Sequence, residues 1–268
     1  MDLSLDQASV GRYTSKSQIA RVSTQNWIAR ELPCLKCSTR PLQPTAENTK
    51  SRDFFCRNCE EPYELKSKSS PFTRWVTNGA YATLLETITA GRTPNLLLLE
   101  YDPIERYVTR LQAVHRTLLS PIAVVARKPL SPTARRHGWQ GCNIDLGTVA
   151  ESGRVPIVWN RTILPWPTVV GAWSRFDFMV KIRPESQGWV RDVLACVKSL
   201  PDHTFRLEDV YCFERKLAEL HPSNQHIRPK IRQQLQILVA QGVVNRVRPG
   251  LYELPRAQAQ RSLESFGN

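Results

Sequence analysis

Four cysteines in the first quarter of the chain have the spacing of a zinc site. They form the pattern Cys34-x2-Cys37-x18-Cys56-x2-Cys59. Each Cys-x2-Cys pair offers two sulfurs from one tight turn, and two such pairs complete a tetrahedron around Zn²⁺. Because four protein sulfurs leave no open coordination position, the predicted zinc is structural rather than catalytic. The alternative is two unrelated pairs of buried cysteines, but the doubled spacing favours zinc.

Charged side chains flank the second cysteine pair. Asp53 precedes Cys56, and Glu64 and Lys66 follow Cys59. Residues 52–55 and 63–67 both have the composition of short strands. If the two strands are neighbours, Asp53, Glu64 and Lys66 converge at one end of the pair. Strand alternation then places Glu64 and Lys66 on one face and turns Leu65 into the core.

Two carboxylates and an ammonium group at one spot suit metal-assisted hydrolysis of a phosphodiester. Asp53 and Glu64 are expected to hold Mg²⁺, and Leu65 is the third predicted cofactor-binding position. The cation would lower the pKa of a bound water, and Lys66 would orient that water or help to deprotonate it. The alternative is a solvated charged strand, because short Glu-x-Lys matches arise by chance. Residues 214–216 also match, but they lie in a helical pattern without an upstream aspartate.

The elements around these groups indicate one mixed α/β domain. The apolar pattern predicts two helices, over 14–31 and 78–90. The segment 95–101 is a continuous apolar run between two prolines, which is typical of a buried strand. Further strand-like segments are 107–119, 121–126 and 155–159.

The pattern changes after Pro184. Three amphipathic helices are predicted, followed by two short strands around Pro249-Gly250; the five segments are 188–200, 207–220, 228–240, 243–247 and 251–254. Three helices and a terminal hairpin in so short a span are typical of a winged helix. The chain is thus predicted to hold a nuclease domain over 1–183, a winged-helix DNA-binding domain over 184–256 and a polar tail over 257–268.

Composition narrows the class of protein. The chain has 268 residues, 37 Lys and Arg against 24 Asp and Glu, and a net charge of +13. Hydrophobic residues make up 41 %, which excludes wholesale disorder and a fibrous protein. The sequence contains no apolar run of the length of a membrane helix and no signal-peptide pattern, so we expect a cytoplasmic protein and no membrane partner. The excess positive charge indicates a polyanionic partner.

Two basic segments are candidates for DNA contact. Residues 127–139 hold four basic residues and no acid, and residues 226–256 hold six basic residues and one acid. In the third helix of a winged helix, exposed side chains point at base edges, and Gln can pair with adenine and Lys with guanine. These base-reading candidates are Lys230, Gln233 and Gln234. The candidates for phosphate contact are His226, Arg246 and Arg248.

An apolar or aromatic side chain beside hydrogen-bonding groups can form a wall against a base or a wedge between bases. Trp139, next to Arg135 and Arg136, is the candidate for such a wall or for a wedge between bases. A core tryptophan is the alternative for Trp139.

Four segments together resemble a known family. They are RDFFCRNCEEPYELKSK, NGAYATLLETI, RKPLSPTARRHGWQGCNIDL and HIRPKIRQQLQIL. They are similar to the methyl-directed restriction endonucleases that include DpnI and the Dam-replacing proteins, over about residues 13–254.

The resemblance implies a PD-(D/E)XK nuclease domain with a zinc-binding insertion, followed by a winged helix. It also implies cleavage of duplex DNA at 5′-GATC-3′ when the adenine carries an N6-methyl group. Asp53, Glu64 and Lys66 match the family's active-site motif, and the four cysteines match its zinc ligands. Arg52 stands where that motif has proline.

The prediction is therefore a type II methyl-directed endonuclease that uses Mg²⁺ and structural Zn²⁺ and is a monomer in solution. Two alternatives remain open. One is a non-catalytic regulator made of a zinc ribbon and a winged helix, and the other is a nuclease with a different site or methylation preference. The sequence leaves open whether the cut is blunt or staggered, which domain dominates affinity and whether cleavage of both strands needs two copies.

Overall fold

The computed structural model describes residues 1–6, 11, 13–46 and 52–255. Arg256 and the predicted polar tail lie outside the described residues. The described chain divides into two compact units, each assembled from three chain segments. The first unit comprises Met1–Thr73, Thr93–Arg116 and Arg154–Ser174, and the second comprises Arg74–Arg92, Thr117–Gly153 and the chain from Arg175 onward. The predicted boundary after residue 183 falls inside the second unit; it divides the sequence rather than the compact units and stays a prediction.

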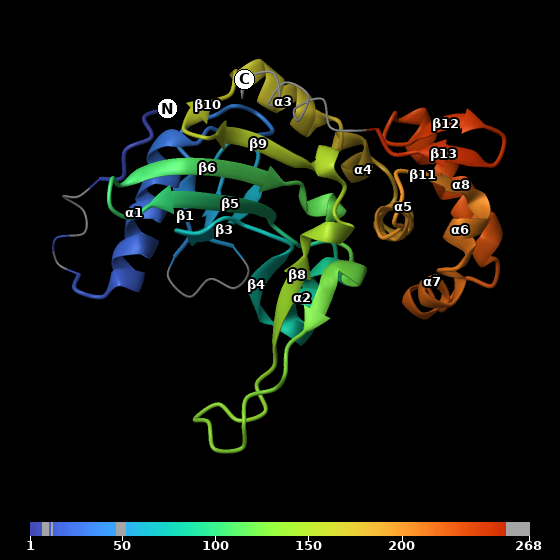
Figure 1. The fold of residues 1–268 in the computed structure, drawn as a ribbon, viewed down its shortest axis with the longest axis horizontal. Helices are drawn as coiled ribbons and strands as arrows, with labels where there is room; N and C mark the ends of the chain where they lie inside the picture. Colours follow the sequence, from blue (N-terminus) through green and yellow to red (C-terminus); the bar gives the residue numbers. More distant parts are fainter. Residues whose placement is uncertain (7–10, 12, 47–51, 256–268) are drawn as a thin grey trace. The chain divides into compact units, whose positions relative to one another are not determined.

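The first unit is built on a seven-stranded sheet with the order β1-β2-β3-β5-β6-β9-β10 (Figure 1). Its strands are β1 (Gln43–Pro44), β2 (Phe54–Phe55), β3 (Pro62–Lys68), β5 (Asn95–Asp102), β6 (Tyr107–Val114), β9 (Arg154–Trp159) and β10 (Thr162–Ile163). β3 and β5 run parallel, and the other neighbours run antiparallel. Helix α1 (Lys16–Glu31) packs against β1 and β3, and α3 (Trp166–Ser174) packs against β9.

The centre of this sheet confirms the predicted buried strand. β5 is buried without interruption from Asn95 to Glu100. A strand covered on both faces shows a continuous apolar run rather than alternation. β5 thereby forms the interior of the sheet and gives β3 a rigid neighbour, with Glu64 opposite Leu96 and Lys66 opposite Leu98.

The second unit contains two three-stranded sheets, with the orders β4-β8-β7 and β11-β13-β12. The first is formed by β4 (Trp75–Ala80), β7 (Val124–Ala126) and β8 (Gly141–Asp145), and helix α2 (Tyr81–Thr89) packs against β4 and β7. Short 3₁₀ helices η3 (Pro121–Ala123), η4 (Leu146–Thr148) and η5 (Glu151–Gly153) flank these strands, and η2 (Arg116–Leu118) precedes them.

The rest of the second unit is helical with a small sheet. It contains α4 (Asp177–Lys181), α5 (Pro184–Lys198), α6 (Leu207–Tyr211), α7 (Glu214–Leu220), α8 (Ile227–Ala240), β11 (Thr204–Arg206), β12 (Asn245–Arg248) and β13 (Leu251–Glu253). α8 packs against α5, α6 and α7. The three predicted helical regions and the terminal hairpin are thus present, with β11 added to the hairpin through Phe205 opposite Tyr252.

A buried carboxylate joins several parts of the second unit. Asp192 of α5 has no exposed surface. Its Oδ1 accepts hydrogen bonds from Ser120 Oγ at 2.7 Å and from Arg191 Nε at 2.9 Å. Its Oδ2 lies 2.9 Å from His221 Nε2, and the His221 ring stacks on Trp189. Arg191 also donates to the carbonyl oxygen of Ile88 at 3.2 Å. Buried charges need such partners, so this network fixes α5 to η3, to the end of α2 and to the end of α7.

Several predicted elements differ in extent from those observed. The helix predicted over 207–220 is two helices, because the chain turns at Cys212 and Phe213. The helix predicted over 78–90 begins only at Tyr81, since the residues before it form β4. Strands β1, β4, β8, β10 and β11 were not predicted. Among the described residues, no helix combines the length and apolar character needed to cross a membrane.

Candidate functional site

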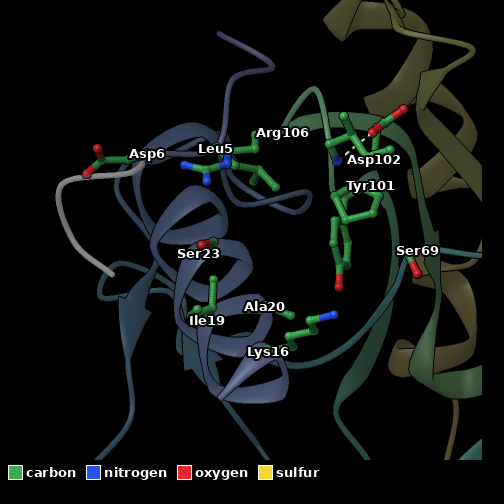
Figure 2. A pocket seen from close by; sticks show the side chains of 12 residues that line it. Leu5, Asp6, Lys16, Ile19, Ala20, Ser23, Ser69, Tyr101, Asp102 and Arg106 are labelled. Atoms are coloured by element: carbon green, nitrogen blue, oxygen red, sulfur yellow. Dashed lines mark hydrogen bonds between the residues drawn. The ribbon is translucent and has the colours of Figure 1, made fainter. Parts of the chain in front are cut away.

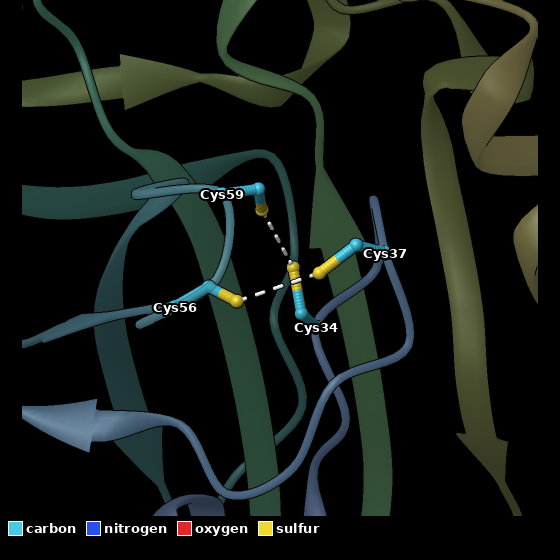
Figure 3. Close-up of side chains that lie close together, drawn as sticks. All are labelled: Cys34, Cys37, Cys56 and Cys59. Carbon is cyan, nitrogen blue, oxygen red and sulfur yellow. Dashed lines mark hydrogen bonds between the residues drawn. The ribbon is translucent and has the colours of Figure 1, made fainter.

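The four cysteines predicted to bind zinc converge on one point (Figure 3). Their sulfur atoms all lie within 4.8 Å of one another. The sulfurs of Cys34 and Cys59 lie 3.5 Å apart, as do those of Cys37 and Cys56, and both distances join the two cysteine pairs. Zn–S bonds of about 2.3 Å in a tetrahedron place sulfurs about 3.8 Å apart, so this cluster has the size and donor set for structural zinc.

Hydrogen bonds and burial act on these thiols in opposite directions. Burial opposes the ionisation of Cys37, but hydrogen bonds with Thr39 and with neighbouring side chains outweigh it and lower its pKa to about 6. At Cys34 burial prevails and raises the pKa. Hydrogen bonding thus favours the thiolate form of Cys37, which is the form that binds a metal.

A buried glutamate links the two cysteine turns to the sheet. The Glu61 side chain is only 4 % exposed. It accepts hydrogen bonds from Lys36 at 3.2 Å and from the Asn95 amide at 2.9 Å, and the Arg116 Nε lies 3.1 Å from it. Lys36 stands between Cys34 and Cys37, and Asn95 begins β5. The predicted zinc site is therefore fastened to the central strand by charged hydrogen bonds.

The structure brings Asp53, Glu64 and Lys66 to neighbouring positions. Asp53 immediately precedes β2, and its Oδ2 accepts a hydrogen bond from the Leu65 N–H at 2.7 Å. Glu64 Oε1 lies 2.7 Å from Lys66 Nζ. Both Glu64 and Lys66 are partly exposed, with 18 % and 24 % of their side-chain surfaces accessible. The predicted pairing of the two strands is confirmed by Phe54 opposite Tyr63.

Two details of this group differ from the prediction. Asp53 lies in the bend before the strand rather than within it, and its backbone N–H donates to the Tyr63 carbonyl at 2.8 Å. Leu65 is partly buried rather than fully in the core. A leucine can offer a cation only its backbone oxygen, because its side chain has no donor atom.

The basic segment 127–139 forms most of the long connection between β7 and β8 (Figure 1). Trp139 is partly exposed there, which makes it an accessible side chain rather than a core one. The Arg136 guanidinium lies 5.2 Å from the centre of the Trp139 ring, and Arg135 is exposed. The ring packs closely over Gly141, where a Cβ atom would come within 3.0 Å of it. Gly141 therefore makes room for the indole.

One residue predicted to read bases, Gln234, is buried. On α8, Gln233 is exposed and Lys230 is partly exposed, but Gln234 is fully buried. The buried side of the helix runs through Ile231 and Leu238, and Gln234 lies three residues after the first and four before the second. Helical spacing of three and four residues places all of them on one face. Gln234 therefore cannot reach DNA in this conformation.

The flanking candidates for phosphate contact are on the surface. His226, Arg246 and Arg248 are all exposed. The sequence analysis missed an arginine pair around Tyr211, whose hydroxyl accepts a hydrogen bond from Arg232 Nε at 2.7 Å. The Arg228 guanidinium lies 5.1 Å from the centre of the same ring. The spacing of the two arginines, four residues apart on one helix face, is the signal that could have identified them.

A pocket of about 560 Å³ in the first unit shares no lining residue with the groups above (Figure 2). Lys16, Ile19 and Ala20 of α1 face Tyr101 across it, and Asp102 and Arg106 lie at the turn between β5 and β6. The Asp102 carboxylate accepts the backbone N–H groups of the residues two and three positions later. Asp102 thus stabilises a turn, and we assign the pocket no chemistry.

Comparison with protein-family models identifies the chain. Residues 1–182 match the model of the DpnI, or Dam-replacing, family. Residues 185–254 match the model of the Dam-replacing helix-turn-helix domain. The first match contains all four cysteines and the group formed by Asp53, Glu64 and Lys66, and the second contains α8. The two matches together span nearly the whole chain, and the protein belongs to the DpnI, or Dam-replacing, family.

Proposed function

We propose that the protein is a methyl-directed restriction endonuclease that cleaves duplex DNA at 5′-GATC-3′ when its adenine is N6-methylated. Family membership supports a methyl-directed endonuclease, and the helix-turn-helix domain implies DNA binding. The observation that carries the cleavage chemistry is the grouping of Asp53, Glu64 and Lys66 at the junction of β2 and β3.

The donor set of this group fits Mg²⁺. Asp53 and Glu64 each have one carboxylate oxygen held by the protein, by the Leu65 N–H and by Lys66 respectively. The second oxygen of each, with the backbone oxygen of Leu65, would hold the cation. When bound, the cation supplies Lewis acidity toward the phosphate and toward a bound water. In this proposal the group is the active site of a PD-(D/E)XK nuclease.

Lys66 is proposed to orient the attacking water and to stabilise negative charge on the phosphate. Its ammonium group is held beside Glu64 at 2.7 Å, so it is fixed rather than free to rotate. From there it orients the attacking water and stabilises negative charge that develops on the phosphate. The Leu65 N–H orients the Asp53 carboxylate so that the two carboxylates keep a constant geometry through the reaction.

Recognition is proposed to use two surfaces. In the connection between β7 and β8, Trp139 forms a wall or wedge for the methylated base, and Arg135 and Arg136 contact phosphate. In the helix-turn-helix domain, the base-reading side chains of α8 are Lys230 and Gln233, while His226, Arg246 and Arg248 contact phosphate. The four cysteines hold a structural zinc ion, and the protein works as a monomer in solution.

The test is a paired digestion. The same plasmid is prepared in two forms, one with adenine methylation at GATC and one without it. Both forms are incubated with Mg²⁺ and the protein. Cutting of the methylated plasmid alone is the expected result. Equal cutting of the two overturns the methyl specificity. Cutting of neither overturns the nuclease and favours a regulator that binds DNA without hydrolysis.

Point variants test the assigned residues. Asp53→Ala and Lys66→Ala should abolish cleavage while a gel-shift assay still shows binding to methylated DNA. Lys216→Ala is the matched control, because Lys216 belongs to the second Glu-x-Lys sequence of the chain and lies exposed on α7. Cleavage by either active-site variant at the wild-type rate would reject the assigned site.

A further inference from the structure

Tyr63 lies between the predicted zinc site and the predicted active site. It is the second residue of β3, directly before Glu64, and its side chain has no exposed surface. Its hydroxyl oxygen lies 3.3 Å from the sulfur of Cys34 and 3.1 Å from the Leu35 backbone nitrogen. A buried phenol hydroxyl must find its hydrogen-bond partners within the protein. These two partners therefore determine where the hydroxyl proton points.

The direction of the hydrogen bond to Cys34 follows from the partners. The Leu35 N–H can only donate, so the Tyr63 oxygen accepts from it. The hydroxyl proton then points to another acceptor, and the sulfur of Cys34 lies within reach at 3.3 Å. A zinc-bound cysteine is a thiolate and can only accept. When zinc is bound, the Tyr63 hydroxyl therefore donates a hydrogen bond to the Cys34 sulfur.

The backbone of the same residue connects to the other site. The Tyr63 carbonyl accepts the Asp53 N–H at 2.8 Å, and Tyr63 pairs with Phe54 across β2 and β3. One residue thus touches a zinc ligand with its side chain and the backbone of Asp53 with its carbonyl group.

We propose that Tyr63 is a positioning residue that donates a hydrogen bond to the zinc-bound thiolate of Cys34 and thereby links the zinc ion to the strand that carries Glu64. Partners of metal ligands orient them and tune their basicity. The hydrogen bond withdraws electron density from one of the four sulfurs and holds the first cysteine turn against β3. The inference rests on the proposed zinc site but not on nuclease activity.

Tyr63→Phe tests the inference, because it removes the hydroxyl and keeps the buried ring. Zinc transfer from the full-length protein to a chromogenic chelator is followed for the wild type and the variant. Loss of a partner of a metal ligand typically weakens metal binding about 10- to 100-fold, and we expect zinc transfer to be faster within that range. Tyr101→Phe is the control, since Tyr101 lies on β5 in the same sheet and lines the pocket in Figure 2.

A second measurement separates a bond to sulfur from a loss of packing. The wild type and both variants are loaded with Co²⁺, and the sulfur-to-cobalt charge-transfer band is recorded. A thiolate that loses a hydrogen bond is a stronger donor, so the band of Tyr63→Phe should move to lower energy. A general loosening of the fold lowers the melting temperature without moving this band.

The outcomes are distinguishable. An unchanged band and an unchanged transfer rate in Tyr63→Phe, with one zinc per wild-type chain, overturn the role of Tyr63 and leave the zinc site intact. Faster transfer with an unmoved band also overturns it, because the hydroxyl then acts only through packing. A wild-type protein that binds no zinc overturns the zinc site and this inference together, while the digestion experiment judges the nuclease separately.

Discussion

Replacing Asp192 with asparagine removes a charge that lies entirely inside the second unit. The carboxylate has no exposed surface and receives hydrogen bonds from Ser120 and Arg191, with His221 at 2.9 Å. Asparagine keeps one acceptor oxygen and turns the other into an N–H donor. The variant therefore retains part of the network but leaves Arg191 without its buried counter-charge.

The expected cost follows from these partners. Removing one member of a buried ion pair costs about 3–5 kcal/mol of unfolding free energy. Arg191 keeps its hydrogen bond to the Ile88 carbonyl and is 13 % exposed, so part of its charge stays solvated. We therefore expect the lower end, about 3 kcal/mol, which corresponds to a fall in melting temperature of about 6–12 °C for a chain of this size.

The pH dependence gives a second readout. Burial alone would raise the pKa of Asp192, but hydrogen bonding to His221 and the nearby Arg191 outweigh it and hold the pKa below 3.8. The unfolded carboxyl titrates near 3.8, so the native pair contributes its full stability above that pH and loses it as the pH falls through the lower native pKa. The difference in unfolding free energy between the wild type and Asp192→Asn should therefore be at its maximum at pH 7 and should shrink below pH 3.8.

Thermal denaturation followed by circular dichroism measures both effects. Glu219→Gln is the matched control, because the pair of Arg215 and Glu219 has side-chain exposures of 94 % and 65 %. An exposed pair contributes under about 0.5 kcal/mol. If Asp192→Asn lowers the melting temperature no more than Glu219→Gln does, the assignment of a stabilising role to the buried network is refuted.

Three further predictions use other parts of the chain. Gly141→Ala should displace the Trp139 ring, which a Cβ would approach to 3.0 Å, and should slow cleavage of methylated DNA more than Gly171→Ala, where a Cβ meets nothing within 4 Å. Gln234→Leu should raise the unfolding free energy by about 1 kcal/mol in urea denaturation, since its buried Oε1 has no hydrogen-bond partner among the described residues; a loss of stability would contradict this. Burial lowers the pKa of His115 to about 4 from 6.5, so the unfolded state binds the extra proton first, and stability should fall by up to about 3 kcal/mol as the pH drops from 7 to 4. Replacing His115 with phenylalanine should flatten that slope in urea titrations.

The confirmed predictions are those that depend on residues close together in the sequence. A Cys-x2-Cys turn forms from four adjacent residues, so its spacing alone predicts where its two sulfurs lie. The pairing of β2, which follows Asp53, with β3, which holds Glu64, was predictable for a similar reason, since a short connection joins the two strands. The buried run of β5 was also readable, because a strand covered on both faces needs apolar residues throughout.

The features that were not predicted depend on contacts between distant parts of the chain or on helical phase. β4 and β8 pair across the second unit with a long stretch of chain between them, so neither segment alone signals a strand. The amide of Gln234 suits adenine, which is why it was predicted to face DNA, but its helical phase with Ile231 and Leu238 places it on the buried side. The contact of Tyr63 with Cys34 depends on how β3 lies beside the first cysteine turn. No spacing in the sequence encodes that distance.

The interleaving of the two units has a consequence for how the protein is made. On the ribosome, β4 ends at Ala80, but its partner β8 begins only at Gly141. At about 5–20 residues per second, β4 is synthesised several seconds before its partner strand. The sheet of the first unit likewise waits for β9, which begins at Arg154. Unpaired strand edges are templates for association, so slow elongation prolongs a vulnerable interval that no single-domain truncation can remove. The yield of folded protein should therefore depend on the translation speed between β4 and β8. Synonymous codons in that stretch should change the yield.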